Sequence, residues 1–237
     1  MPSVTYIGWD AFSGASSLTS VDMPSITHIG GAAFSGASSL TSVDIPAGVT
    51  HIGQWAFLGA TGLTEIRVAP GNVYYRDIDG VLFDHAATAL YTYPAGRDAA
   101  HYAVPDSVTT IGEYAFAWAT SLTSVDMPGV TSIEWRAFWY AGSLASVDIP
   151  ASVTYIGSSA FEGASSLTSA TIRSRDATFG LWVFRNAHPD FAIHAFVGST
   201  AENYARNNGH NFVPLDGLDI PSGIRASRQN HGRRGRQ

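Results

Sequence analysis

The chain has 237 residues, of which 45% are hydrophobic, and it has no cysteine, which excludes disulfide bonds and thiolate metal sites. Its net charge is −6, but five of the thirteen arginines lie in the last thirteen residues, so residues 1–224 carry 8 − 19 = −11. This acidic body argues against nucleic acid as a partner, because phosphate binding needs a basic surface. No apolar run reaches the roughly 18 residues of a membrane span, and none is predicted.

One stretch, ITHIGGAAFSGASSLTSVDIPAG from Ile26 to Gly48, recurs with small changes before and after itself. Adjacent units are spaced by 22 or 23 residues, a period typical of solenoid repeats. The units begin at Val4, Ile26, Val49, Val108, Val130 and Val153.

The chain begins partway through a unit, since residues 1–5 (MPSVT) match residues 23–27 (MPSIT). No charged segment followed by an apolar one, as in a signal peptide, precedes the repeats. Because the end of a solenoid needs a polar cap, we expect the chain to be the C-terminal part of a longer array, or to expose its first coil.

Within a unit, the apolar spacing predicts one strand and one helical turn. Leu40, Val43 and Ile45 follow the L-x-x-L-x-L arrangement of a short strand whose alternate side chains face inward. Phe34 and Ala37, which precede it, fit a single helical or 3₁₀ turn with its apolar side inward. One coil cannot bury these side chains alone, so we expect a hydrophobic core that runs along a stack of coils.

Residues 71–107 interrupt the repeats. They predict a β-meander, with strands at 73–75, 81–83, 90–93 and 102–104 and a turn at Asp79-Gly80. Two interpretations stay open. The insertion is an enlarged pair of coils that keeps the stack continuous, or it is a projecting ligand-binding hairpin.

Residues 176–215 predict the end of the array, as a degenerate coil followed by a cap. Ser199 and Glu202 form a capping box that opens a short helix, which Gly209 can stop. A last strand follows. From 216 to 237 the chain is rich in Gly, Ser and Arg with little to bury, so a disordered Arg-rich tail is predicted.

Two sets of polar side chains share a slot in successive units. The stacked acids would lie about 5 Å apart and could attract calcium, but without a glycine-rich calcium loop solvated carboxylates are favoured. These acids are Asp22, Asp44, Asp126 and Asp148. His28 and His51 could hold a transition metal, yet no third ligand recurs in their slot.

No arrangement of residues indicates catalysis. The sequence has no recognisable Ser–His–acid set, no paired carboxylates in a cleft and no phosphate-binding glycine motif. We therefore predict no catalytic residue, no metal site and no cofactor.

The units differ most in the slots that flank the repeated Ala-Phe pair. Large aromatic and charged residues there are expected near solvent, where Trp, Tyr and Arg anchor interfaces. Packing between coils is the alternative. The candidate ligand-binding residues are Trp55, Tyr114, Trp118, Trp135, Arg136, Trp139 and Tyr140.

The pattern V-T-x-I-G-x-x-A-F-x-x-A-x-x-L-x-x-V-x-I-P resembles the BspA-like, or Treponema pallidum type, leucine-rich repeat over residues 4 to about 173. The I-D-G-V-L and Y-P-x-G segments of the insertion and the terminal GSTAENYARNNGHNFVPL resemble the same family. The family often has cysteine where this chain has Ala15, Ala37, Ala60, Ala119, Ala141 and Ala164.

The resemblance implies a right-handed leucine-rich repeat solenoid over residues 1–215, with strands along one face and a C-terminal cap. It also implies a non-enzymatic, adhesin-type module that binds protein or glycan on a host or neighbouring cell, located at the cell surface or secreted as part of a longer protein. The alternatives are a structural spacer, a cytoplasmic scaffold, and a parallel β-helix enzyme acting on polysaccharide.

Overall fold

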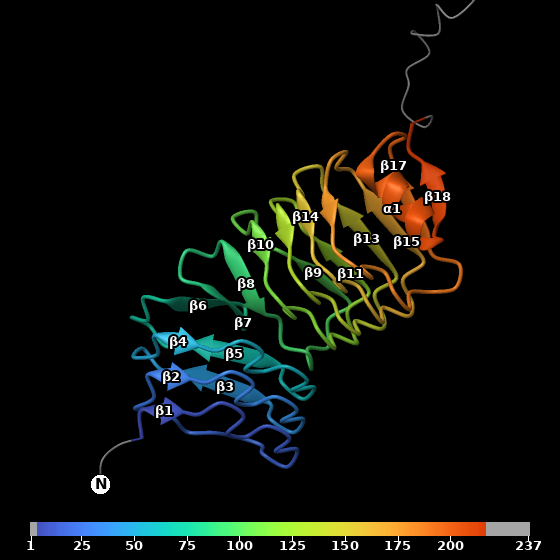
Figure 1. Ribbon diagram of the computed structural model, residues 1–237. Helices are drawn as coiled ribbons and strands as arrows, with labels where there is room; N and C mark the ends of the chain where they lie inside the picture. Colours follow the sequence, from blue (N-terminus) through green and yellow to red (C-terminus); the bar gives the residue numbers. More distant parts are fainter. Residues whose placement is uncertain (1–3, 217–237) are drawn as a thin grey trace, which may run out of the picture.

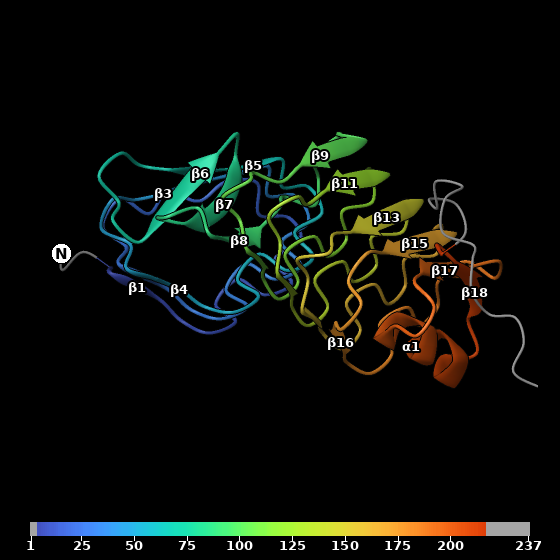
Figure 2. The same cartoon turned by 90° about the horizontal axis from the view of Figure 1, so that it is seen from above.

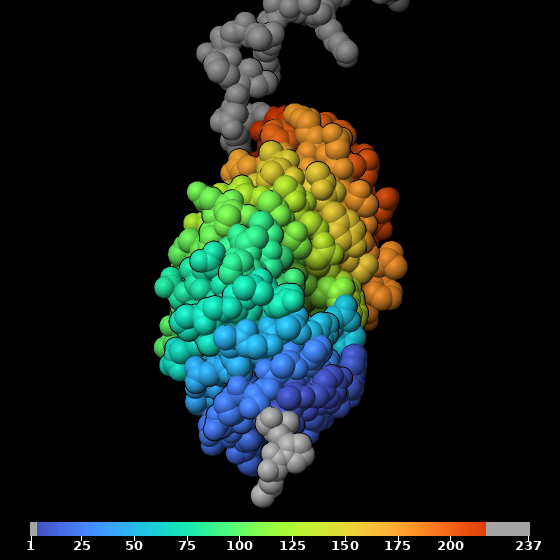
Figure 3. Space-filling view, turned by 90° about the vertical axis from the view of Figure 1, so that its left-hand side faces the viewer, coloured from blue at the N-terminus to red at the C-terminus, as the bar shows by residue number. Residues whose placement is uncertain are grey.

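The structure, a computed structural model, describes residues 4–216, so all but the first residue of the predicted tail lies outside the described part. The chain winds into a β-rich solenoid of about nine turns (Figure 1). Successive coils follow one another along its length, so the chain colours run in order over the surface (Figure 3). None of the helices within residues 4–216 is long and apolar enough to cross a membrane.

The coils contribute two sets of strands, one from the T-x-I part of the units and one from the V-x-I part, so strands lie on two sides of the solenoid rather than on one. The short strands, from the T-x-I part of each unit, are β1 (Tyr6–Ile7), β2 (His28–Ile29), β4 (His51–Ile52), β10 (Thr110–Ile111), β12 (Ser132–Ile133), β14 (Tyr155–Ile156) and β16 (Thr178–Phe179). The strands of the V-x-I part are β3 (Ser42–Ile45), β5 (Glu65–Val68), β9 (His101–Ala103), β11 (Ser124–Asp126), β13 (Ser146–Ile149), β15 (Ser169–Ile172) and β17 (Ala192–Ala195). The prediction of strands at V-x-I is confirmed from the second unit onward, whereas residues 21–23 of the first unit form no strand.

The predicted helical turn at Ala-Phe is wrong. Ala32 and Gly36 have φ of 52° and 71°, which a right-handed helix does not allow. The N–H groups of Ala32 and Phe34 donate outward, to the carbonyls of Gln54 (2.9 Å) and Ala56 (2.7 Å) in the next coil. The segment is thus a series of three tight turns stacked on the turns of its neighbours, and these turns bury the same Ala and Phe side chains as a helix would.

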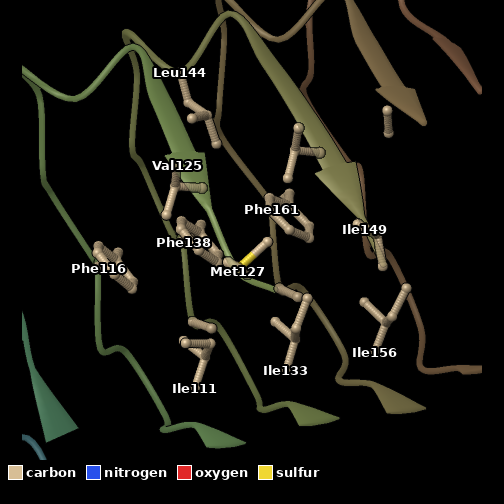
Figure 4. Close-up of a cluster of buried hydrophobic side chains, with 14 of the residues drawn as sticks. Ile111, Phe116, Val125, Met127, Ile133, Phe138, Leu144, Ile149, Ile156 and Phe161 are labelled. Atoms are coloured by element: carbon tan, nitrogen blue, oxygen red, sulfur yellow. The ribbon is translucent and has the colours of Figure 1, made fainter. Parts of the chain in front are cut away.

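The core is a column of stacked rings between the two lines of strands. Phe116, Phe138 and Phe161 are fully buried, with successive ring centroids 4.7 and 4.8 Å apart and nearly parallel planes. Figure 4 shows these rings in line, with Ile133 and Ile156 in a parallel row below them. Since the faces of each ring are covered by the rings of the coils above and below, burial depends on stacking, as the repeat predicts.

The insertion forms an antiparallel meander of β6 (Tyr75–Ile78), β7 (Val81–Asp84) and β8 (Ala89–Thr92), after which β8 pairs in parallel with β10. Strand β7 is buried on both faces. Leu82 packs with the core of the first coils, whereas Val81 and Phe83 pack with the core of the later coils. The meander therefore lies within the stack, not beside it.

The first strand of the meander starts at Tyr75, two residues later than the predicted Val73, because Asn72 holds the chain in a turn. Its side-chain oxygen accepts hydrogen bonds from the N–H groups of Tyr74 (2.9 Å) and Tyr75 (2.8 Å). Its amide nitrogen donates to the carbonyls of Pro46 (3.0 Å) and Val49 (2.9 Å), which ties the turn to the coil before it.

The array ends in helix α1 (Thr200–Asn208) and strand β18 (Asn211–Pro214), which pairs with β17. The N-cap and the stop of the helix are confirmed: Ser199 Oγ accepts from Glu202 N–H at 3.2 Å, and Gly209 ends the helix with φ of 72°. The Glu202 carboxylate does reach back, but it accepts from the N–H of Gly198 (2.6 Å) and not from that of Ser199. Figure 2 shows α1 at the end of the stack, near β16. Tyr204 Oη accepts a hydrogen bond from the N–H of Val183 at 2.9 Å, which joins α1 to the last coil.

Candidate functional site

Two of the four aspartates that share a slot form ion pairs with arginines. Asp44 pairs with Arg67 (3.4 Å), and Asp148 pairs with Arg173 (2.7 Å), each from a later coil. Both pairs are more than half exposed, so their contribution to stability is small. Among residues 4–216, no group of three or more His, Asp or Glu side chains could hold a metal ion.

His28 and His51 lie opposite each other on β2 and β4, with ring centroids 6.2 Å apart. The Tyr6 ring lies 6.0 Å from the His28 ring on the other side. The three rings thus lie in a row across β1, β2 and β4, so residues in the same slot of adjacent coils are neighbours, as the sequence predicts.

The seven candidate ligand-binding residues come together on the turn side of the coils, and we call them the aromatic cluster. Trp118 stacks on Tyr140 with centroids 4.8 Å apart, and Trp139 meets both at 5.8 and 4.7 Å. Tyr114 contacts Trp139 at 5.6 Å. The remaining ring contacts are Tyr114–Trp135 at 5.1 Å, Trp55–Tyr114 at 5.9 Å and Trp55–Trp135 at 6.0 Å.

Arg136 lies at the centre of the aromatic cluster. The carbon of its guanidinium is 4.8 Å from the ring centroids of both Trp135 and Trp139, and 5.7 Å from that of Tyr114. Its Nη1 donates to Tyr114 Oη at 2.7 Å. Ring faces attract a cation, so this box fixes a positive charge among three aromatic side chains.

The aromatic cluster is half-buried, so both interpretations of these slots are partly right. Tyr140 is 39% exposed, and the other six side chains are partly covered by their neighbours in adjacent coils. The Tyr140 ring lies over Gly163 of the next coil, where an added Cβ would be 2.9 Å from the ring. The rings thus pack between coils and remain partly exposed to solvent.

Five of the seven residues adopt a backbone conformation that L-amino acids disfavour. Trp55, Tyr114 and Arg136 have φ of 61°, 56° and 55°, and Trp118 and Tyr140 have φ of 62° and 54°. A bulky side chain at positive φ is uncommon, and the cost is about 1–2 kcal/mol per residue. In the slot of Trp118 and Tyr140, four other coils carry a glycine instead: Gly14, Gly36, Gly59 and Gly163.

Trp9 is a neighbour of the aromatic cluster that the sequence analysis did not include. Its ring lies 6.2 Å from that of Trp55, although a whole coil separates their units. The contact is possible because Gly31 in the intervening coil has no side chain, and a Cβ there would be 2.4 Å from the Trp9 ring. The sequence signal for this contact is the small Gly31 in the coil between those of Trp9 and Trp55.

Comparisons with known proteins give a family and a set of similar folds. The family model of the BspA type leucine rich repeat region matches residues 1–86 and 95–196, with six copies. A comparison with curated proteins gives no match.

Three solved structures share the fold. A leucine-rich repeat protein from Eubacterium ventriosum ATCC 27560 is 21% identical with a TM-score of 0.65, over 83% of this chain and 64% of that one. The pneumococcal vaccine antigen PcpA is 20% identical with a TM-score of 0.66, over 89% and 65%. A leucine rich cell surface protein from Faecalibacterium prausnitzii A2-165 is 30% identical with a TM-score of 0.68, over 86% and 60%. The chain thus covers less than two thirds of each of these structures.

Proposed function

Because the chain belongs to the family of proteins with BspA-type leucine-rich repeats, we propose that it is a non-enzymatic recognition module. Its ligand is a protein or a glycan of a host or neighbouring cell, and the aromatic cluster is the contact surface. The module acts at the bacterial cell surface. One similar structure is a cell surface protein and another is a vaccine antigen, which supports that location.

The observation that carries this proposal is the strain at Trp118 and Tyr140. Glycine is the relaxed residue for positive φ, and four other coils use it in this slot. Strain of this kind persists where surrounding structure imposes it, and it collects at functional sites. A requirement for stability alone would favour glycine, so large aromatic residues here point to a role in binding.

The composition of the aromatic cluster also fits recognition. Trp, Tyr and Arg are the side chains that dominate binding energy at protein interfaces, since they bury large areas and still offer polar atoms. The solenoid holds them on stacked turns whose backbones are hydrogen-bonded to their neighbours. Such a rigid display loses little conformational entropy when a ligand binds.

The test replaces the strained pair with the residue that other coils use, in the double variant Trp118→Gly and Tyr140→Gly. The substitution removes three ring contacts of about 0.5–1.5 kcal/mol each and relieves strain of about 1–2 kcal/mol at each of the two residues. Because the two effects oppose each other, stability stays within about 2 kcal/mol of wild type. Binding to the ligand found in a screen of matrix proteins and glycans falls at least about tenfold, or about 1.4 kcal/mol.

The matched control is Trp182→Gly. Trp182 also has positive φ (57°) and is 55% exposed, but it lies in the degenerate coil before the cap, outside the aromatic cluster. This variant keeps full binding. If the double variant loses several kcal/mol of stability and binds as well as wild type, the rings serve packing alone, and a structural spacer becomes the better description.

A further inference from the structure

The turns of adjacent coils are joined by a repeated set of hydrogen bonds, which we call the turn ladder. In each step, three N–H groups at alternate residues of one turn donate to three carbonyls at alternate residues of the next. The step from the second coil to the third consists of Ala32 N–H to Gln54 O at 2.9 Å, Phe34 N–H to Ala56 O at 2.7 Å and Gly36 N–H to Leu58 O at 2.7 Å.

The turn ladder stops after the third coil. Within residues 4–216, the N–H groups of Trp55, Phe57 and Gly59 have no acceptor, although the same slots donate in the coil before. On the far side of the gap, the carbonyls of Glu113 and Ala117 have no donor in that part of the chain, although their slots accept in the regular coils. Phe57 and Ala117 are buried, and buried backbone groups without a partner are rare in folded proteins.

The gap arises because the coil supplied by the insertion has a turn that is two residues short. Leu90 of β8 lies opposite Ile111, and Tyr93 takes the slot of Phe116, with stacked rings 5.0 Å apart. From Leu90 to Tyr93 the chain advances 93 − 90 = 3 residues, against 116 − 111 = 5 in the next coil. The Tyr93 N–H still donates to Ala115 O at 2.8 Å, so one of the three bonds of that step survives.

The missing part of the turn leaves a cavity of about 340 Å³ between the third coil and the next regular one. Its volume is at the lower end of the range for small-ligand sites. Trp55 and Tyr114 meet across it with ring centroids 5.9 Å apart. The aromatic side chains that line it are Trp55, Phe57, Tyr75, Tyr91, Tyr93 and Tyr114, and Gln54 and Glu113 also line it.

We propose that this cavity binds a short peptide segment of a partner protein, whose backbone supplies the missing step of the turn ladder. The unmet donors of Trp55, Phe57 and Gly59 repeat at alternate residues, and in the other steps such donors meet carbonyls of a polypeptide with the same repeat. A peptide also carries N–H groups for the carbonyls of Glu113 and Ala117. An apolar side chain of the segment would lie between the aromatic rings of the cavity.

This site is distinct from the contact surface proposed above, although Trp55 and Tyr114 belong to both. It depends on the missing turn residues and on backbone groups, not on the strained Trp118 and Tyr140. The two proposals therefore fail separately: the double glycine variant leaves this cavity intact, and filling the cavity leaves Trp118 and Tyr140 in place.

The experiment titrates the blocked tripeptide N-acetyl-Ala-Phe-Gly-amide, which matches the composition of a regular turn, into the full ¹⁵N-labelled chain. The amide signals of Trp55 and Phe57, the two unmet donors that line the cavity, are expected to move together, and their hydrogen exchange to slow, as two alternate carbonyls of the peptide accept their N–H groups. The signals of Phe34 and Gly36, which already donate within the turn ladder, serve as internal controls and stay in place.

The matched variants are Ala117→Leu and Ser35→Leu. Ala117 lines the cavity, and other coils carry Leu58 and Trp139 in its slot, so the fold accepts a large residue there. Ala117→Leu fills the cavity and weakens tripeptide binding at least about tenfold. Ser35→Leu places leucine in the same slot of the second coil, away from the cavity, and leaves binding unchanged.

Equal binding by wild type and Ala117→Leu would overturn the proposal, as would amide signals that stay fixed with excess tripeptide, since water would then occupy the cavity. N-acetylglucosamine is the comparison ligand, because it carries one amide but no alternating backbone. Movement of the same signals by this sugar and not by the tripeptide would also overturn the peptide assignment. Circular dichroism confirms folding, and Ala95→Val, at another lining residue, replaces Ala117→Leu if that variant unfolds.

Discussion

Replacing Phe138 with alanine tests whether stability comes from the column of stacked rings. Phe138 is fully buried and stacks on Phe116 at 4.7 Å and on Phe161 at 4.8 Å. Truncating a buried phenylalanine costs about 3–5 kcal/mol. Phe12 occupies the same slot at the end of the described column, where it is 37% exposed and stacks only on Phe34, so Phe12→Ala should cost about 1–2 kcal/mol.

The assay is urea denaturation followed by circular dichroism, with the dependence of unfolding free energy on urea fitted for each variant. A quasi-one-dimensional array predicts that the cost of the substitution rises from the end of the column to its middle. Equal losses for Phe12→Ala and Phe138→Ala would refute this reasoning, because they would mean that the end ring has the same number of supporting neighbours as a central one.

Three further predictions concern the cap, the coil spacing and the inserted strand. Burial lowers the pKa of His210 below 6.5, so the imidazole binds a proton more readily in the unfolded chain than in the folded one. The free energy of unfolding should therefore fall as pH drops through 6.5. Urea titrations at several pH values should show a smaller fall for His210→Gln. Gly53→Ala would place a Cβ 2.3 Å from the backbone nitrogen of Gly31 and should lower the free energy of unfolding by about 1–3 kcal/mol, measured by urea denaturation. Gly8→Ala is in the same slot, with no atom nearer than 4.0 Å to the added Cβ, and should be nearly neutral. Leu82→Ala should speed hydrogen exchange mainly in the first three coils and Phe83→Ala mainly in the coils after the insertion, since their side chains face different cores; a uniform change in both halves would contradict this.

The sequence predicts the elements whose pattern is local. Val43 and Ile45 alternate with polar residues, so their strand is predictable, and Ser199 with Glu202 is sufficient to locate α1. The short T-x-I strands have only two residues, too few to show an alternating pattern. Tight turns and a helical turn bury the same Ala-Phe pair, so apolar spacing cannot distinguish them.

Part of the candidate site follows from slot identity, because a shared slot in stacked coils means contact. This is why Trp118 and Tyr140 could be placed together from the repeat alone. The box around Arg136 and the contact of Trp9 with Trp55 depend on side-chain directions and on which neighbouring slots are small. The cavity depends on how the turn after Leu90 aligns with the next coil, and that alignment is visible only once strand register is known.

The repeat also supplies a standard against which single residues can be judged. Where a slot is filled for structural reasons, its occupant follows from its surroundings, as at Gly53, whose missing Cβ leaves room for the coil before it. Trp118 and Tyr140 depart from that logic, because the backbone in their slot favours glycine and four other coils have it. The shortened turn before Tyr93 is a second departure, and it leaves backbone groups unpaired. Both departures fall between residues 55 and 140, and the repeat requires neither of them, so this stretch is where a binding protein would differ from a spacer.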